Sequence, residues 1–231
     1  MTKYIKVNND SIAKTVLIVE TFSYAKFIAD TYLTDCKFIN NLIYTGYYND
    51  ELVTIMVGGI GISSIGIYSY ELFNFYEVKN IVFIGLASSY TRDLNLNDIV
   101  LVNGSYSEST YAKTQNGCEE NILYSNNNLN FYLKETAEEL GVHLTLANIH
   151  SSDVLYKEYE NFKKLYNDYG CLARDIGSFA LFHNANVFNK KAASLLTICD
   201  NLVTQEKIVD EQIQDSLKNI IEVVLETVKK L

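Results

Sequence analysis

The sequence predicts an α/β fold with a largely parallel or mixed sheet, and three observations support it. Short apolar, β-branched runs alternate with helical patterns of ten or more residues along the whole chain. No linker, internal repeat or low-complexity segment divides it. The length of 231 residues fits one domain, and 48% hydrophobic with 20% charged residues is typical of a globular protein.

The first half of the chain supplies four predicted strands and two helices. The strands are short runs rich in Val, Ile and Leu, namely Thr15–Val19, Leu52–Val57, Asn80–Ile84 and Asp98–Gly104. Helical patterns follow the first two strands, one over about 23–33 and one that comes after the run at 58–64 and continues through Phe75. The third strand ends at Gly85. A polar, Asn-rich stretch over 105–128 has little periodicity, so we expect a long loop there.

The second half continues the alternation. An amphipathic helix over Phe131–Leu140 stops at Gly141, a good C-terminal cap. Val142–Ile149 alternates like a strand. The elements predicted after it are helices over Glu158–Tyr169 and Ser178–Asn186, a buried strand over Ala193–Cys199 and a long amphipathic helix over Asp210–Lys230.

Ligands of such sheets bind beyond the carboxyl ends of the strands. We therefore expect a site among the loops that follow the predicted strands, after Val19, Val57, Ile84, Asn103, Ile149 and Cys199.

Composition excludes several classes of function. A formal charge of −9 repels phosphate backbones, so no nucleic-acid partner is expected. No apolar run approaches a membrane span and the N-terminus lacks the apolar core of a signal peptide, so we expect a cytoplasmic protein without a membrane partner. The four cysteines show no CxxC and no His at ligand spacing, which predicts reduced, buried thiols, no metal and no cofactor. Only two arginines occur, Arg92 and Arg174, which nearly excludes any site built on clustered guanidinium groups.

Local motifs leave alternatives open. The run GGIGISS, residues 58–64, follows a strand and opens a helix, so it is either a backbone-lined ligand site or a tight, closely packed turn. Arg174 and Asp175 precede a helix and either bind a ligand hydroxyl or form a surface ion pair. Tyr156 lies just after a predicted strand end. The histidines at 143, 150 and 183 are dispersed and are expected to be structural or surface residues.

Seven segments in this order resemble the bacterial, hexameric-type purine nucleoside phosphorylases of the nucleoside phosphorylase-I superfamily. They are AKFIADTYL (25–33), VGGIGISSIGIYSYEL (57–72), VKNIVFIG (78–85), NLNDIVLVNGS (95–105), HSSDVLY (150–156), YGCLARDIGSFALF (169–182) and SLLTIC (194–199). The resemblance implies a single nucleoside phosphorylase-like domain over residues 1–231, with a twisted mixed sheet flanked by helices. It also implies a homodimer or a trimer of dimers, with sites near the dimer contacts.

The resemblance implies an altered phosphate site. The family holds phosphate with a Gly and an Arg in the first loop, where this chain has Glu20 and Tyr24. A second family arginine corresponds to Phe83, and residues 40–48 lack the third. A carboxylate at Glu20 would repel a phosphate dianion, so we do not expect phosphate to be a good ligand.

The sugar and base sites change as well. The family grips the ribose hydroxyls with two Glu residues on either side of a Met. Asp175 stands at the position of the first Glu and Ile176 at that of the Met, whereas Gly177 leaves the second carboxylate missing. Tyr4 corresponds to the His that a neighbouring subunit contributes. The family's general acid is an Asp in a loop after the last core strand, a role that Asp200 can take only if the backbone turns differently. Tyr156 matches the base pocket, and the remaining expected ligand-binding residues are Gly61 and Ser88.

Two functions follow from these replacements. We expect a purine nucleoside phosphorylase-like protein without ordinary phosphorolysis, which binds a nucleoside or purine base or acts through its oligomer surfaces. The alternative is an active superfamily enzyme that cleaves the N-glycosidic bond, either a nucleosidase whose water is oriented by Glu20 or Asp175, or a diverged phosphorylase. A carboxyl group at the mouth of the pocket, next to where purine N7 would lie, would favour the active enzyme over the inactive protein.

Overall fold

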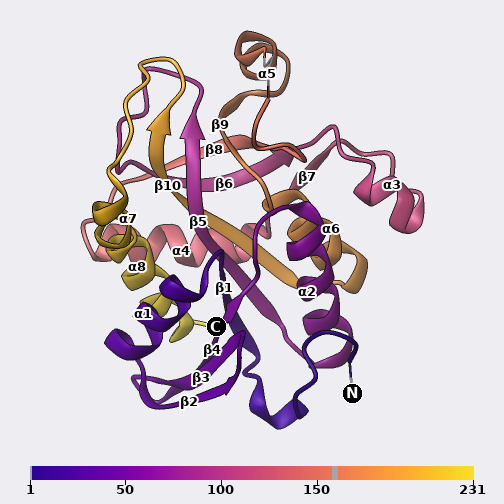
Figure 1. Ribbon diagram of the computed structural model, residues 1–231, viewed down its shortest axis with the longest axis vertical. Coiled ribbons are helices and arrows are strands. Elements are labelled where there is room, and N and C mark those ends of the chain that lie inside the picture. Colours follow the sequence, from indigo (N-terminus) through magenta and orange to yellow (C-terminus); the bar gives the residue numbers. More distant parts are fainter. Residues whose placement is uncertain (1, 158–160) are drawn as a thin grey trace.

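The computed structural model describes residues 2–157 and 161–231, and within them ten strands form one mixed sheet (Figure 1). The strands are β1 (Thr15–Val19), β2 (Thr34–Asn40), β3 (Ile43–Tyr48), β4 (Glu51–Val57), β5 (Asn80–Ser89), β6 (Ile99–Tyr106), β7 (Ile122–Tyr124), β8 (Leu144–Ser151), β9 (Cys171–Asp175) and β10 (Lys191–Asn201). The predicted α/β fold with a mixed sheet is confirmed.

Five of these strands close into a ring. The strand order is β10-β6-β8-β9-β5-β1-β4-β3-β2, with β7 added beside β6, and β10 pairs with β5 as well as with β6. The centre of the sheet is parallel, because β5 runs parallel to both β1 and β10. The pairs β5–β9 and β6–β10 are antiparallel. The carboxyl ends of β1, β5 and β10 therefore meet at the same edge of the sheet.

Helices cover both faces of the sheet (Figure 1). They are α1 (Phe22–Tyr32), α2 (Ile62–Phe75), α3 (Tyr111–Asn116), α4 (Asn127–Glu139), α5 (Phe162–Tyr169), α6 (Ser178–Phe188), α7 (Asp210–Ser216) and α8 (Lys218–Val228), with a short 3-10 turn at Asn9–Ser11. All five residues of β1 are buried. Val16 and Ile18 join the core under α2 and α6, whereas Leu17 and Val19 join the core under α1, α4 and α8. No helix in the described ranges is both long enough and apolar enough to cross a membrane.

The glycine-rich run after β4 is a packed turn. The Gly58 amide donates to the Val19 carbonyl at 2.8 Å. A Cβ on Gly58 would lie 2.4 Å from a methyl carbon of Ile18 and 2.6 Å from one of Ile65, so only glycine fits between β1 and α2. Gly59 and Gly61 have φ of +70° and +98°, which turn the chain into α2. These observations favour the turn interpretation of this run.

Some local predictions were wrong or incomplete. The expected loop over 105–128 contains the end of β6, α3 and β7, because β7 gains its strand geometry by pairing with β6. The hairpin of β2 and β3 and the short strand β9 were missed. The expected single C-terminal helix is divided into α7 and α8 at Leu217. The helix expected from residue 158 is observed from Phe162, and residues 158–160 lie outside the described part of the chain.

Candidate functional site

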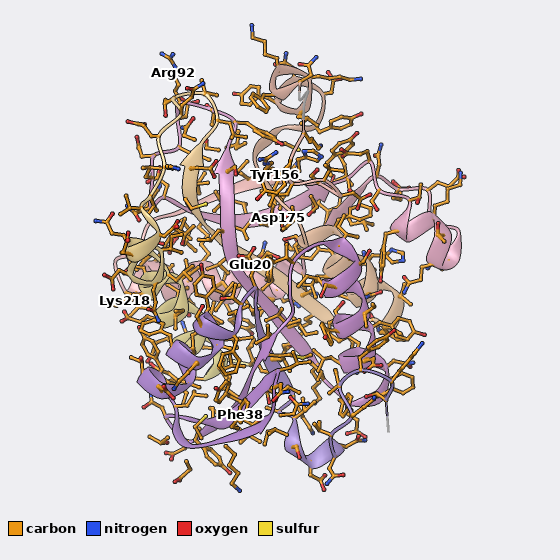
Figure 2. All side chains as sticks on the ribbon, viewed as in Figure 1. Glu20, Phe38, Arg92, Tyr156, Asp175 and Lys218 are labelled. Atoms are coloured by element: carbon orange, nitrogen blue, oxygen red, sulfur yellow. The ribbon has the colours of Figure 1, made fainter. Side chains whose placement is uncertain are left out.

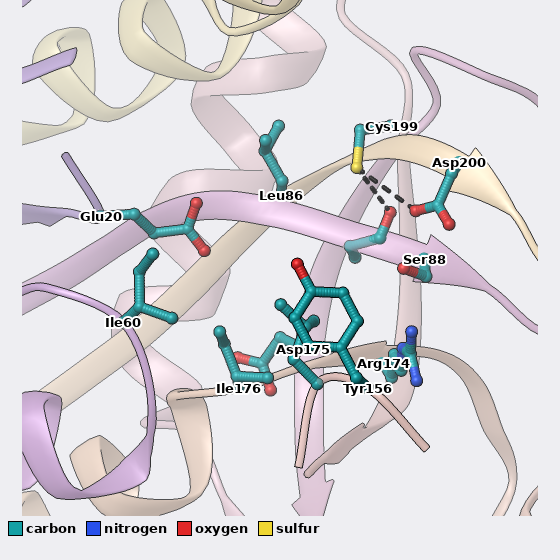
Figure 3. Close-up of a pocket in the computed structure, with 12 residues that line it drawn as sticks. Glu20, Ile60, Leu86, Ser88, Tyr156, Arg174, Asp175, Ile176, Cys199 and Asp200 are labelled. Carbon is teal, nitrogen blue, oxygen red and sulfur yellow. Dashed lines mark hydrogen bonds between the residues drawn. The ribbon is translucent and has the colours of Figure 1, made fainter. Parts of the chain in front are cut away.

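A cavity of about 330 Å³ opens at the edge of the sheet where the parallel strands end (Figure 3). It is lined by Glu20, Ile60, Leu86, Ala87, Ser88, Leu155, Tyr156, Arg174, Asp175, Ile176, Cys199 and Asp200. Five of the six predicted loops supply lining residues. The loop after Asn103 supplies none, and the missed strand β9 contributes Arg174 and Asp175 in its place.

An irregularity in β10 brings two adjacent side chains to the cavity. Ile198 pairs with Ala87 and Asp200 pairs with Ser88, so Cys199 is an extra residue in the register. Successive residues of a regular strand point to opposite faces, and a bulge removes this restriction. The Cys199 thiol lies 3.6 Å from the Ala87 carbonyl and 3.4 Å from an Asp200 oxygen. The bulge lets Asp200 line the cavity, and its role as the general acid stays a prediction.

Asp175 is buried and fully engaged by neighbouring donors. One carboxylate oxygen accepts a hydrogen bond from the Ser151 hydroxyl. The other accepts the Ser178 amide at 2.9 Å and the Ser178 hydroxyl at 2.5 Å. Burial raises the pKa of Asp175, and these hydrogen bonds oppose that rise. Since Ser178 begins α6, the carboxylate ties the end of β9 to the start of that helix.

Glu20 follows β1 and faces the same cavity. Burial, and after it the negative charge of Asp175, raises the pKa of Glu20 from 4.5 to about 8. The described residues offer its carboxyl group no hydrogen bond that would stabilise the charged form. Glu20 is therefore protonated at neutral pH. The expectation that it repels phosphate as a carboxylate consequently applies only above about pH 8.

The other residues assigned to an altered phosphate site do not line the cavity. Phe83 is in the core, packed near Gly85 and Gly177, and contributes no charge. Tyr24 is half-buried in the first turn of α1, where burial and then the charge of Glu20 raise its pKa. Arg92 is exposed at the far tip of the molecule, beyond Tyr156 (Figure 2). Among the described residues, Arg174 is the one basic side chain that lines the cavity.

The expected nucleoside-binding residues are partly brought together. Tyr156, Ile176 and Ser88 line the cavity, and Tyr156 is 91% exposed (Figure 3). Gly61 is not a lining residue, because its φ serves the turn and the neighbouring Ile60 faces the cavity instead. Tyr4 lies elsewhere, with its amide bound to the Glu71 carboxylate at 3.1 Å. Its contact with a neighbouring subunit stays a prediction.

Five lining residues were not predicted as site residues, namely Ile60, Leu86, Ala87, Leu155 and Cys199. Ile60 and Leu155 are exposed apolar residues. Each is next in sequence to a predicted ligand-binding residue, Gly61 or Tyr156, and that adjacency was a usable signal. Cys199 was expected to be a buried structural thiol, yet it is half-buried and faces the cavity. All four cysteines are free, and Cys171 is fully buried. The described residues contain no group of three His, Cys, Asp or Glu side chains that could hold a metal ion.

Comparison with known proteins agrees with this fold. The sequence pattern of the family described as "Phosphorylase superfamily" matches residues 14–229. The chain belongs to the phosphorylase superfamily. Within this superfamily it is 37% identical to a protein of Mycoplasma genitalium named "Purine nucleoside phosphorylase DeoD-type", over the full length of both chains. A protein of Mycoplasma pneumoniae with the same name is 35% identical, again over both full lengths. A Thermoanaerobacter protein of that name is 32% identical over 98% of this chain and 99% of its own. The family membership predicted from the seven segments is confirmed.

Proposed function

We propose that this chain binds a purine nucleoside or purine base in the cavity and does not carry out ordinary phosphorolysis. The observation that carries this proposal is the composition of the cavity wall. It holds the three carboxyl groups of Glu20, Asp175 and Asp200 against the single guanidinium group of Arg174. Phosphate-binding sites rely on several positive or amide donors, and this wall offers a dianion one positively charged side chain.

The remaining lining suits a neutral, partly flat ligand. Ile60, Leu86 and Ile176 supply apolar surface for a base, and Tyr156 offers an aromatic face at the opening. Ser88 and Asp200 supply hydroxyl and carboxyl groups for the polar edges of a base or sugar. Asp175 is less suited to hold a ribose hydroxyl, because its oxygens already accept three hydrogen bonds.

A second candidate function is phosphate-independent cleavage of the N-glycosidic bond, and the raised pKa of Glu20 favours it. In this reaction a water molecule attacks the anomeric carbon while the bond to the base breaks. The bonding electrons leave with the base, and protonated Glu20 gives its proton to a ring nitrogen. Asp200 takes a proton from the attacking water, so the products are the free sugar and the neutral base.

One assay separates these functions. A panel of purine and pyrimidine nucleosides is incubated with and without phosphate, released base is measured by chromatography, and binding is measured by calorimetry. Binding without base release supports the first proposal. Release without phosphate, lost in Glu20→Gln, supports the second candidate. Release that requires phosphate contradicts both.

We further propose that the chain forms a homodimer or a trimer of dimers. Its support is the resemblance of the whole chain to hexameric-type proteins, together with exposed apolar side chains such as Tyr4, Ile67 and Phe75 on neighbouring elements. Sedimentation at micromolar concentration tests the proposal, and a monomer there would contradict it.

A further inference from the structure

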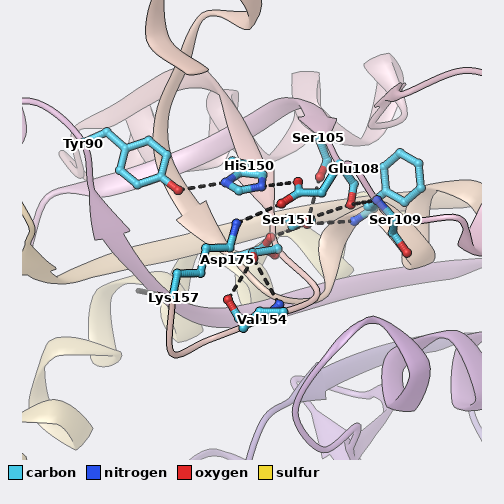
Figure 4. Close-up of polar contacts among 12 residues, drawn as sticks. Tyr90, Ser105, Glu108, Ser109, His150, Ser151, Val154, Lys157 and Asp175 are labelled. Carbon is cyan, nitrogen blue, oxygen red and sulfur yellow. Dashed lines mark hydrogen bonds and ion pairs between the residues drawn. The ribbon is translucent and has the colours of Figure 1, made fainter. Parts of the chain in front are cut away.

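A chain of polar contacts lies beside the cavity, outside the residues assigned to ligand binding (Figure 4). His150 on β8 is buried, with its Nδ1 atom 2.8 Å from the Tyr90 hydroxyl. Its Nε2 atom lies 2.5 Å from one oxygen of Glu108. The other Glu108 oxygen accepts a hydrogen bond from the Lys157 ammonium group at 2.8 Å. Glu108 therefore joins a buried imidazole to a lysine on the loop after β8.

Glu108 is held as a carboxylate. The hydrogen bond from His150, assisted by the one from Lys157, lowers the pKa of Glu108 to about 2. Burial acts in the opposite direction and is outweighed. Charge-assisted hydrogen bonds to both oxygens are stronger than neutral ones and fix the orientation of the carboxylate. Glu108 is half-exposed, but Lys157 is largely covered, with a side-chain exposure of 16%.

The contacts persist in either protonation state of His150. A neutral imidazole that donates from Nε2 to Glu108 accepts at Nδ1 from the Tyr90 hydroxyl. A charged imidazolium donates from both nitrogens, and the Tyr90 oxygen then acts as the acceptor. Glu108 keeps its contact with His150 in both cases.

Lys157 directly follows the two residues of this loop that line the cavity, Leu155 and Tyr156. The loop begins with a turn in which the Ser152 hydroxyl donates to the Val154 carbonyl at 2.9 Å. Beyond that turn, Tyr156 is 91% exposed, so packing does little to hold its ring in place. The ion pair of Lys157 with Glu108 is a polar contact at the residue next to this ring.

We propose that Glu108 is a positioning residue that holds Tyr156 at the cavity through Lys157. His150 and Tyr90 hold Glu108 in turn. The consequence for a ligand rests on the proposed nucleoside site, whereas the consequence for the loop does not. A ring that is already in place loses less conformational freedom when a base stacks on it, so the tether strengthens binding.

The absence of Trp from the chain makes the loop directly observable. The variant Tyr156→Trp places the sole tryptophan at the position in question, and its fluorescence anisotropy reports how freely the loop moves. Glu108→Gln in this background should lower the anisotropy and increase quenching by acrylamide. Lys157→Met should do the same while leaving the contact of Glu108 with His150 in place. Glu119→Gln is the matched control, because it removes an exposed ion pair with Lys113 on the neighbouring segment.

Unchanged anisotropy in both Glu108→Gln and Lys157→Met would overturn the proposal. If Glu108→Gln does not fold, as judged by circular dichroism, the anisotropy of Lys157→Met alone tests the proposal. In the chain that keeps Tyr156 in place of tryptophan, Glu108→Gln should weaken nucleoside binding by about threefold to tenfold, equivalent to roughly 1 kcal/mol. Tyr156→Ala should weaken it at least as much, and adding Glu108→Gln to it should have no further effect. If the effects of Tyr156→Ala and Glu108→Gln on nucleoside affinity are fully additive, Glu108 does not act through Tyr156 and the proposal is overturned. If the protein binds no nucleoside, the proposed function fails and the anisotropy still tests the tether.

Discussion

Glu20 and Asp175 face one cavity, and the negative charge of Asp175 adds to burial in raising the pKa of Glu20 to about 8. The two residues reach the cavity from different strands, since Glu20 follows β1 and Asp175 ends β9. Three hydrogen-bond donors support the charge of Asp175. Glu20 lacks such donors among the described residues, so the proton of the pair is on Glu20.

The raised pKa makes stability depend on pH. The folded-state pKa of Glu20 lies above the unfolded value, so its contribution is complete below about pH 4.5 and is lost as the pH rises through about 8. The free energy of unfolding should fall over this window by up to about 1.4 kcal/mol per pH unit. Glu20→Gln removes this titration and should flatten the decline, as measured by urea unfolding at several pH values.

The raised pKa of Asp175 acts in the same direction, so some decline should remain in Glu20→Gln. Glu120→Gln, at an exposed residue, should leave the profile unchanged and serves as the control. A profile for Glu20→Gln that coincides with the unsubstituted protein would show that Glu20 is ionised at neutral pH.

Asp175→Ala should act mainly on stability. The substitution leaves the Ser151 hydroxyl and the Ser178 amide without this acceptor, whereas the Ser178 hydroxyl keeps the Ser194 hydroxyl at 2.8 Å. Each unsatisfied buried donor costs about 1–3 kcal/mol. We expect a clear loss of thermal stability with Asp175→Ala and a smaller one with Asp175→Asn. A loss of nucleoside affinity in a variant of normal stability would instead support the ribose contact predicted from the sequence.

Glu20→Gly combined with Tyr24→Arg should raise the affinity for phosphate. The pair of changes removes an acidic group from the cavity and adds a guanidinium group near that position, since the charge of Glu20 reaches Tyr24. We expect the dissociation constant for inorganic phosphate, measured by calorimetry, to fall at least about tenfold. Tyr24→Arg alone should gain less. If the double variant binds phosphate no better, residues 20 and 24 do not account for the weak phosphate binding that we propose.

Gly58→Ala should destabilise the fold. The added Cβ would overlap with methyl groups of Ile18 and Ile65, and overpacking of this kind costs about 1–3 kcal/mol. Ser63→Ala in the same turn is exposed and should be nearly neutral. A normal urea midpoint for Gly58→Ala would mean that β1 and α2 can separate without cost.

The sequence predicted the elements whose pattern is local. Runs such as Thr15–Val19 are apolar throughout, because both faces of the strand are buried, and they are recognised without tertiary information. β9 was missed because only Cys171, Ala173 and Asp175 of its five residues are buried, and one of them is charged. β7 has three residues and exists through its pairing with β6, which no local pattern indicates.

The same limit applies to the site. Which loops meet follows from parallel strands, so Glu20, Ser88, Tyr156 and Asp200 could be expected near one another. The bulge at Cys199 depends on the register between β10 and β5, and the tether of Glu108 depends on three strands coming together. Neither register nor a raised pKa is visible in a sequence, since both require neighbours from distant parts of the chain.

The ring of β5, β9, β8, β6 and β10 has a consequence for the order of folding. Its last strand, residues 191–201, follows every other described strand in the chain, so the ring stays open until that segment has left the ribosome. Until then β5 and β6 present unpaired edges, which are prone to join other chains. Asp200 arrives with the closing strand. The cavity is therefore completed in the same step that protects the nascent chain from aggregation.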